Sequence, residues 1–320
     1  MESITKTKLS TEQIERIVRK AFGNSIQPVQ VDEMKEGWFN TSYWIILSDG
    51  REVILKISPP PDIKVLRYEK DVILVEVDVL RLFKETGKFP VPAVYSSDFS
   101  GTIISSDYFI MEKLPGTAYS KIKQSLTSSE REQIDLELGR INRAINDIEG
   151  MEFGLYIQHD KKRKRWSDAF MLMVDDILLD GLEQNVQLPL EYDQIRDVII
   201  SRLSVMDPVD KPCLVHWDLH DGNVIINDGK ITGIIDCDRA LWGDPLIEFY
   251  FSKFPERENF FKGYGPSLID TKEGKCRRVL YNIYLDLVMV VESYYRKYTK
   301  EHMNWTYNLL QKEIDVLNNL

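Results

Sequence analysis

The sequence has few features that would stabilise a fold other than a large hydrophobic core. Its three cysteines, Cys213, Cys237 and Cys276, are far apart and form no Cys-x-x-Cys pair, which argues against a disulfide framework and against a zinc site. No apolar run approaches the about 18 residues of a membrane span, and the N-terminus lacks the apolar segment of a signal peptide. These absences predict a cytoplasmic protein that is not inserted in a membrane.

Positive charge is also scarce. The chain has 41 Lys and Arg against 51 Asp and Glu, a formal net charge of -10, whereas nucleic-acid binders usually carry an excess of cations. We therefore interpret the basic run KKRKRW at 161–166 as a solvated loop and expect no nucleic-acid partner. The 320 residues are 43% hydrophobic, enough to bury the core of an ordered protein with two lobes.

Strand patterns dominate the first third of the chain, and helical patterns dominate the rest. Two β-rich runs in 43–57 flank Asp49-Gly50, a strong hairpin signal, and 108–114 has the pattern of a buried strand. Helical periodicity follows over 134–148, where Ser129 and Glu132 form a capping-box pattern, and over three further stretches: 170–179, 192–203 and 276–298. The sequence thus predicts an α+β fold with a strand-rich lobe at 1–114 and a helical lobe at 115–320.

A second hairpin is predicted around Asp228-Gly229. Short apolar runs lie on both sides, so a two-residue turn should pair Asn227 with Lys230 and place Asn223 opposite Ile234. Asp236 would leave the same end of the hairpin, within about 7 Å of Asn223.

The side chains at this end suggest a metal site with a base beside it. An amide oxygen from Asn223 and a carboxylate from Asp236 suit Mg²⁺, which prefers oxygen ligands. Asp218, five residues before Asn223, lies in the preceding loop and can approach the same point without being a ligand. This spacing separates a base from the metal pair.

The motifs of this region resemble those of a known family. Residues 216–223, HWDLHDGN, match the H-x-D-x-x-x-x-N catalytic loop of kinases. The loop is similar to that of the aminoglycoside phosphotransferase and choline kinase-like family, in which HGDLHPGN is the usual form, and the segments 234–236 (IID) and 243–245 (GDP) extend the match. The resemblance implies a protein-kinase-like bilobal fold, with a small antiparallel β-sheet lobe and a larger, mainly helical lobe. It also implies transfer of the γ-phosphoryl group of ATP or GTP to a hydroxyl of a small molecule.

The resemblance also assigns residues to the nucleotide. Lys56 stands where kinases place the lysine that contacts the α- and β-phosphates, and Glu76 stands at the position of its ion-pair partner, with Glu69 as a competitor. Residues 37–42 occupy the place of the glycine-rich loop but contain only one glycine, so donors from Asn40, Thr41 and Ser42 would cradle phosphate instead. The backbone of Glu112 and Leu114 would bind the adenine edge.

In the catalytic loop, the resemblance makes Asp218 the group that accepts or orients the proton of the acceptor hydroxyl. His216 and His220 are expected to brace the loop. Two residues depart from the usual pattern. Trp217 replaces a small residue, where it would either narrow the acceptor pocket or pack beneath the loop. Glu248 stands where Asp is frequent, and its role is not predicted.

The acceptor is less defined. An aminoglycoside-type amino sugar is favoured, and a choline-like amino-alcohol, another sugar or a homoserine-like metabolite remain open, as does a non-catalytic nucleotide-binding module. Acidic Asp286 or Glu292 could receive a cationic acceptor by charge complementarity, although Tyr281, Tyr284 and Tyr295 fit core packing of the same helix equally well. The sequence defines neither the choice between ATP and GTP nor the oligomeric state.

Overall fold

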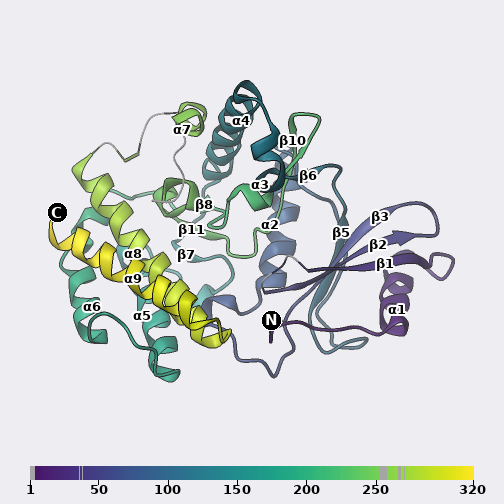
Figure 1. Cartoon of the computed structure of the whole chain (residues 1–320), viewed down its shortest axis with the longest axis horizontal. Coiled ribbons are helices and arrows are strands. Elements are labelled where there is room, and N and C mark those ends of the chain that lie inside the picture. The colour runs from purple at the N-terminus through teal and green to yellow at the C-terminus, as the bar shows by residue number, and fades with distance from the viewer. Residues whose placement is uncertain (1–3, 36, 38, 253–257, 266–267, 270) are drawn as a thin grey trace. The chain divides into compact units, whose positions relative to one another are not determined.

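The computed structural model describes residues 4–35, 37, 39–252, 258–265, 268–269 and 271–320. The chain forms two compact units. Unit 1 contains Met1–Lys64, Asp71–Tyr119 and Val224–Asp238, and unit 2 contains Val65–Lys70, Ser120–Asn223 and Arg239–Leu320. Each unit is thus built from segments that are distant in the sequence (Figure 1). The predicted division at residue 114 stays a prediction.

Unit 1 is built on a five-stranded antiparallel sheet with the strand order β1-β2-β3-β5-β4. Its strands are β1 Pro28–Met34, β2 Thr41–Leu47, β3 Glu52–Ile57, β4 Val94–Asp98 and β5 Tyr108–Glu112. The hairpin predicted at Asp49-Gly50 is confirmed, because β2 and β3 pair on either side of this turn. The buried strand predicted at 108–114 is β5, which ends two residues earlier.

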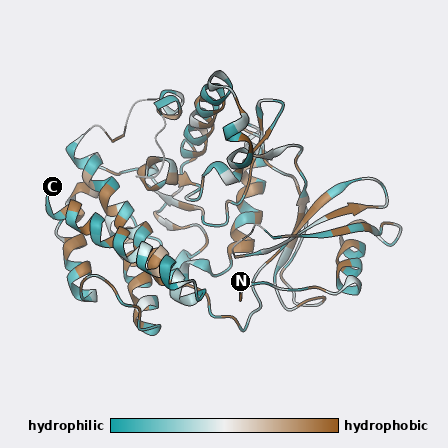
Figure 2. Ribbon diagram, in the orientation of Figure 1, coloured by the Kyte–Doolittle hydropathy of each residue, from teal (hydrophilic) through white to brown (hydrophobic). Residues whose placement is uncertain are grey.

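One face of this sheet is covered by α1 (Thr11–Phe22). Alternate residues of β2 are buried from Thr41 to Leu47, and the apolar ones share a hydrophobic cluster with Ile14, Ile17 and Val18 of the helix. Figure 2 shows hydrophobic residues along these strands, whereas α1 is largely hydrophilic. The two-residue period of β2 therefore separates a face packed on α1 from an opposite, half-buried face that carries Ser42, Trp44 and Ile46.

Unit 1 also contains α2 (Val72–Thr86) and a small sheet of the order β10-β9-β6, formed by β6 Thr117–Ala118, β9 Val224–Asn227 and β10 Lys230–Ile234. Gly116 precedes β6 with a φ of +115°, and a Cβ at this position would lie 2.3 Å from the Ile226 carbonyl oxygen. Only glycine therefore permits this approach of β6 to β9.

The predicted register of the second hairpin is wrong by one residue at its open end. Asn227 pairs with Lys230 as expected, but a bulge between Ile231 and Gly233 shifts the pairing, so that Val224 and not Asn223 lies opposite Ile234. A bulge adds one residue to one strand and changes which side chains face each other beyond it. Extrapolation from an ideal two-residue turn could not include this insertion.

Unit 2 is mainly helical. Its longer helices are α4 Ser128–Asn146, α5 Trp166–Glu183, α6 Tyr192–Ile200, α8 Lys272–Tyr295 and α9 Lys300–Asn318. Two shorter helices are α7 Glu258–Tyr264 and α3 Tyr119–Ile122, whose first residue belongs to unit 1. The helices predicted at 134–148, 170–179, 192–203 and 276–298 correspond to α4, α5, α6 and α8, whereas α9 was not predicted. The capping box of α4 is formed by Thr127 and Glu130, so the assignment to Ser129 and Glu132 was wrong. Two overlapping S/T-x-x-E patterns occur here, and the first begins the helix.

A three-stranded sheet, β7 Gly154–Leu155, β11 Leu241–Gly243 and β8 Cys213–Val215, completes unit 2. The basic run at 161–166 is paired with nearby acids, since Lys161 contacts Asp176 and Arg165 contacts Asp168. Among the described residues, no helix has the length and apolar character that crossing a membrane requires. The architecture is α+β, as predicted from the sequence.

Candidate active site

A buried lysine of unit 1 gathers three carboxylates around its ammonium group. Lys56, on β3 and opposite Ser42 of β2, is 6% exposed. Its Nζ lies 2.5 Å from Glu76 of α2 and 3.7 Å from Asp238, and it also contacts Asp236. A buried ammonium is stable only with such partners. The sheet and α2 therefore bring Lys56 and Glu76 together, and the loop that follows β10 supplies the aspartates.

Electrostatics keeps this lysine charged. Burial opposes the charge, but the carboxylates of Asp236, Glu76 and Asp238 outweigh it and hold the pKa of Lys56 well above its ordinary value. Burial likewise raises the pKa of Glu76, to about 7, and Lys56 offsets part of that rise. Glu69, the predicted alternative to Glu76 as the ion-pair partner of Lys56, belongs to unit 2 and contacts Arg296 there.

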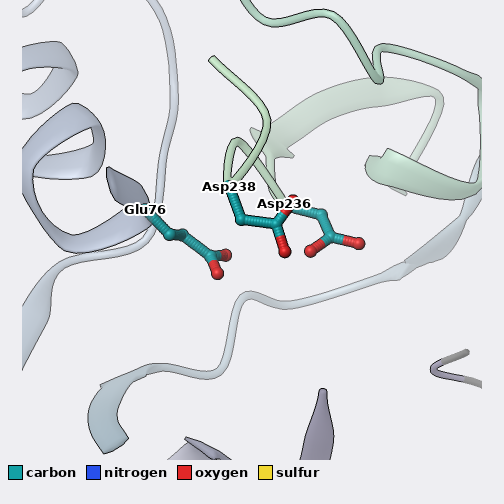
Figure 3. A group of neighbouring side chains, drawn as sticks. All are labelled: Glu76, Asp236 and Asp238. Atoms are coloured by element: carbon teal, nitrogen blue, oxygen red, sulfur yellow. The ribbon is translucent and has the colours of Figure 1, made fainter. Parts of the chain in front are cut away.

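The same carboxylates fit a divalent cation. Figure 3 shows Glu76 approaching from α2, with Asp236 and Asp238 on one loop, and an oxygen of each lies within 4.8 Å of the others. The Asn40 amide donates to Asp238 over 3.0 Å, and its own side-chain oxygen is buried with no hydrogen-bond partner among the described residues. Oxygen-rich sets of this kind suit Mg²⁺. Asp236 has a φ of +65°, so a left-handed residue orients one of the carboxylates.

In unit 2, Asp218 lies in a loop, residues 216–223, that is held by hydrogen bonds among its own residues. The Asp218 backbone N–H donates to His216 Nδ1 over 3.3 Å. The Asn223 amide donates to the Asp218 carbonyl over 2.8 Å and to its carboxylate over 3.3 Å. Because the amide nitrogen of Asn223 is used in this way, its side-chain oxygen is the atom that a cation would take. His220 accepts from the Gly222 N–H over 2.9 Å, as a loop brace would.

Glu248 supports this loop through hydrogen bonds to its backbone. It is fully buried, and its carboxylate accepts the N–H groups of Trp217 over 3.0 Å and Leu219 over 3.1 Å, on either side of Asp218. Burial raises the pKa of Glu248 to about 7 despite these bonds. Trp217 is 5% exposed and stacks on Tyr284 of α8, so the second of its two predicted placements, packing beneath the loop, is the one observed.

The remaining predicted site residues occupy two places in unit 1. Asn40 and Thr41 are buried at the start of β2, and Thr41 accepts the Thr7 backbone N–H over 2.8 Å. Trp38, in the same loop, lies outside the described residues. Glu112 ends β5, and its N–H donates to the Ala93 carbonyl over 2.8 Å. Leu114 lies beside Gly233.

The structure thus brings together Lys56, Glu76 and Asp236 in unit 1, and Asp218 with Asn223 in unit 2. Asp238 was not among the predicted site residues, although the Asp-x-Asp spacing at 236–238 is a pattern typical of paired cation ligands. Asp286 is fully buried and Glu292 contacts Arg296, so core packing, the alternative stated for this helix, describes them better than acceptor binding.

Curated proteins of Aspergillus fumigatus are partly similar to this chain. One subtelomeric hrmA-associated cluster protein is 28% identical over 149 residues, which cover 46% of this chain and 28% of that protein. Another is 30% identical over 125 residues, or 39% of this chain and 24% of that protein. The matched part of the chain thus spans less than a third of the length of these relatives.

Solved structures share the fold over nearly the whole chain. A protein assigned as a fructosamine-3-kinase from Haemophilus somnus has a TM-score of 0.71 at 20% identity and covers 94% of this chain and 97% of its own. Aminoglycoside phosphotransferase APH(4)-Ia, in complex with ADP and hygromycin B, has a TM-score of 0.69 at 19% identity. The match covers 95% of this chain and 98% of that chain. A family model described as the phosphotransferase enzyme family matches residues 31–273. With its protein-kinase-like fold and a family match over most of its length, the chain belongs to the phosphotransferase enzyme family.

Proposed function

We propose that this phosphotransferase is a Mg²⁺-dependent kinase that transfers the γ-phosphoryl group of ATP or GTP to a hydroxyl of a small molecule. The observation that carries the proposal is the buried ion pair of Lys56 with Glu76, with Asp236 on the same ammonium group. A charge arrangement so costly to bury is typical of sites that bind a charged ligand. The family match supports the general reaction.

In this proposal the residues of unit 1 bind the nucleotide. Lys56 contacts the α- and β-phosphates, and Glu76 holds its ammonium in place. The backbone of Glu112 and Leu114 binds the base, and donors from Asn40, Thr41 and Ser42 lie along the phosphates. Asp236 and Asn223 would hold Mg²⁺, with Asp238 as a further oxygen donor. When bound, the ion neutralises charge on the transferred group.

Asp218 acts on the acceptor. Its carboxylate accepts the hydroxyl proton while the acceptor oxygen forms a bond to the γ-phosphorus, and the bond from that phosphorus to the β–γ bridging oxygen breaks. The products are a phosphomonoester and a nucleoside diphosphate. The hydrogen bond that His216 accepts from the Asp218 N–H, the one that Asn223 donates to the Asp218 carboxylate and those that Glu248 accepts fix the direction of the loop that carries Asp218. Such positioning is the main source of rate in phosphoryl transfer.

An aminoglycoside-type amino sugar is the acceptor we favour. Solved structures with this fold include APH(4)-Ia with hygromycin B and APH(2")-IIa with streptomycin and ATP. A fructosamine-3-kinase shares the fold as well, so a sugar of another kind, a choline-like amino-alcohol or a homoserine-like metabolite are alternatives. A non-catalytic nucleotide-binding module is the alternative of a different class.

The test is an acceptor panel combined with one variant. Transfer of labelled phosphate from ATP and from GTP is measured for amino sugars, neutral sugars and amino-alcohols. We expect transfer to at least one acceptor, and Asp218→Ala should lower kcat by about 100-fold or more while nucleotide binding is kept. Nucleotide binding without transfer to any acceptor would instead favour the non-catalytic module. Turnover of Asp218→Ala near that of the wild type would remove the assignment of the base.

A further inference from the structure

The N-terminal segment Thr5–Leu9 lies along the described residues 37 and 39–42, which we call the phosphate loop and which include the start of β2. Thr5 Oγ1 donates to the Phe39 carbonyl over 2.8 Å, Lys6 Nζ donates to the Asn40 carbonyl over 2.7 Å, and the Thr7 N–H donates to Thr41 Oγ1 over 2.8 Å. Every one of these pairs is 34 residues apart. A constant separation means that the two segments run parallel and in register.

Of these three contacts, only the one from Lys6 to Asn40 involves a charged side chain. Thr5 and Thr41 are buried, and the Thr7 hydroxyl donates to the Ser58 carbonyl over 2.9 Å, so the threonines anchor the segment to the sheet. Lys6 is instead half-buried, and its Nζ would lie 3.4 Å from a Cβ placed on Gly37. The ammonium therefore sits between Gly37 and Asn40, inside the loop proposed to cradle phosphate.

The surroundings of Lys6 contain a second positive charge. Burial is the main cause that lowers the pKa of Lys6, Glu33 opposes it, and the ammonium of Lys56 lowers it further by a smaller amount than Glu33 raises it. Two ammonium groups in one partly buried region repel each other. A polyanion between them would remove that repulsion and gain charge-assisted hydrogen bonds from both.

We propose that Lys6 is a second lysine that binds the polyphosphate of the nucleotide, in addition to Lys56. This inference rests on the proposed function. The phosphate loop contains one glycine, so few of its N–H groups can approach phosphate as closely as in a glycine-rich loop. The ammonium of Lys6 compensates for the missing N–H contacts to phosphate, since lysine serves as a point charge for phosphate. Lys6 is thus a binding residue that the family match, which begins at residue 31, does not include.

The experiment compares ligands that differ only in phosphate. Dissociation constants of adenosine, ADP and ATP are measured by calorimetry with Mg²⁺ for the wild type, Lys6→Met, Lys6→Arg and Thr5→Val. Lys6→Met should weaken ATP binding by about 10-fold or more, the scale of one charged hydrogen bond, and leave adenosine binding within about two-fold. Lys6→Arg should restore most of the ATP affinity, because it keeps the charge.

Thr5→Val is the matched control, since it removes the neighbouring contact of the same segment without changing charge. It should leave the ratio of the ATP to the adenosine constant unchanged. The inference is overturned if Lys6→Met binds ATP as the wild type does, or if it weakens adenosine and ATP equally, because the lysine would then only anchor the segment. Guanosine, GDP and GTP are measured in the same way, and a wild-type protein that binds neither series would overturn the proposed function itself.

Discussion

Trp217 stacks on Tyr284, with ring centroids 5.6 Å apart and 15° between the ring planes, although its own backbone has a φ of +63°. A bulky residue in the left-handed region is strained and persists only where its surroundings hold it. Here the stack, an edge contact with Tyr68 and the N–H bond to Glu248 provide that support. Glycine, the usual residue at this position in the family that the sequence resembles, adopts such a φ without strain.

The first prediction separates the strain of Trp217 from its packing. Trp217→Gly and Trp217→Ala both remove the buried ring, and we expect each to lower the free energy of unfolding by about 3–5 kcal/mol. Only alanine retains the steric penalty of the left-handed backbone, so Trp217→Gly should be the more stable of the two by about 1 kcal/mol. Urea unfolding measures both variants. An alanine variant as stable as the glycine variant would show that the loop relaxes to another backbone conformation.

Much of the site was predictable because its residues lie in short, continuous motifs. The hairpin at Asp49-Gly50 and the strand that carries Lys56 follow from turn residues and periodicity. The pairing opposite Ile234 did not follow, because a bulge depends on packing beyond the two strands. The support that Glu248 gives to Trp217, and the contact of Lys6 with Asn40, join positions 31 and 34 residues apart that no local pattern relates.

The second prediction concerns the cation site. Asp236→Asn should abolish the Mg²⁺-dependent part of nucleotide binding, because the amide supplies no negative charge for the ion. In the presence of a chelator, the same variant should bind nucleotide as well as the wild type or better, since one charge that repels phosphate is removed. Calorimetry with and without Mg²⁺ measures both effects. Asp49→Asn, at a surface turn where the carboxylate contacts Arg51, is the control and should behave as the wild type. Full Mg²⁺ dependence in Asp236→Asn would contradict the assignment.

The third prediction concerns a buried ion pair of unit 2. Glu69 contacts Arg296 and accepts the Leu66 N–H over 2.9 Å, and both charged side chains are nearly inaccessible to solvent. Glu69→Gln keeps an acceptor for Leu66 but removes the charge, so it should destabilise the protein by about 3 kcal/mol in urea unfolding. Glu15→Gln breaks the exposed pair with Arg19 and should change stability by less than about 0.5 kcal/mol. Equal effects of the two substitutions would show that burial of the Glu69 pair has no consequence for stability.

The fourth prediction follows from the buried carboxyl group of Glu248. Burial raises its pKa from the ordinary 4.5 to about 7, so between these values the folded protein binds a proton that the unfolded chain does not. Stability contributed by this group is therefore present at low pH, falls as the pH rises through the window and stays constant above it. The full loss corresponds to about 3 kcal/mol.

Glu248→Gln removes this titration and keeps the shape of the side chain. The free energy of unfolding of the wild type minus that of the variant should therefore decrease by about 3 kcal/mol between about pH 5 and pH 8, whatever the constant offset from the lost charge. Urea unfolding at several pH values gives this difference directly and cancels the titration of other groups, Glu76 included. A difference that is independent of pH, or that increases with pH, would mean that the hydrogen bonds from Trp217 and Leu219 keep Glu248 ionised throughout and that burial does not control its charge.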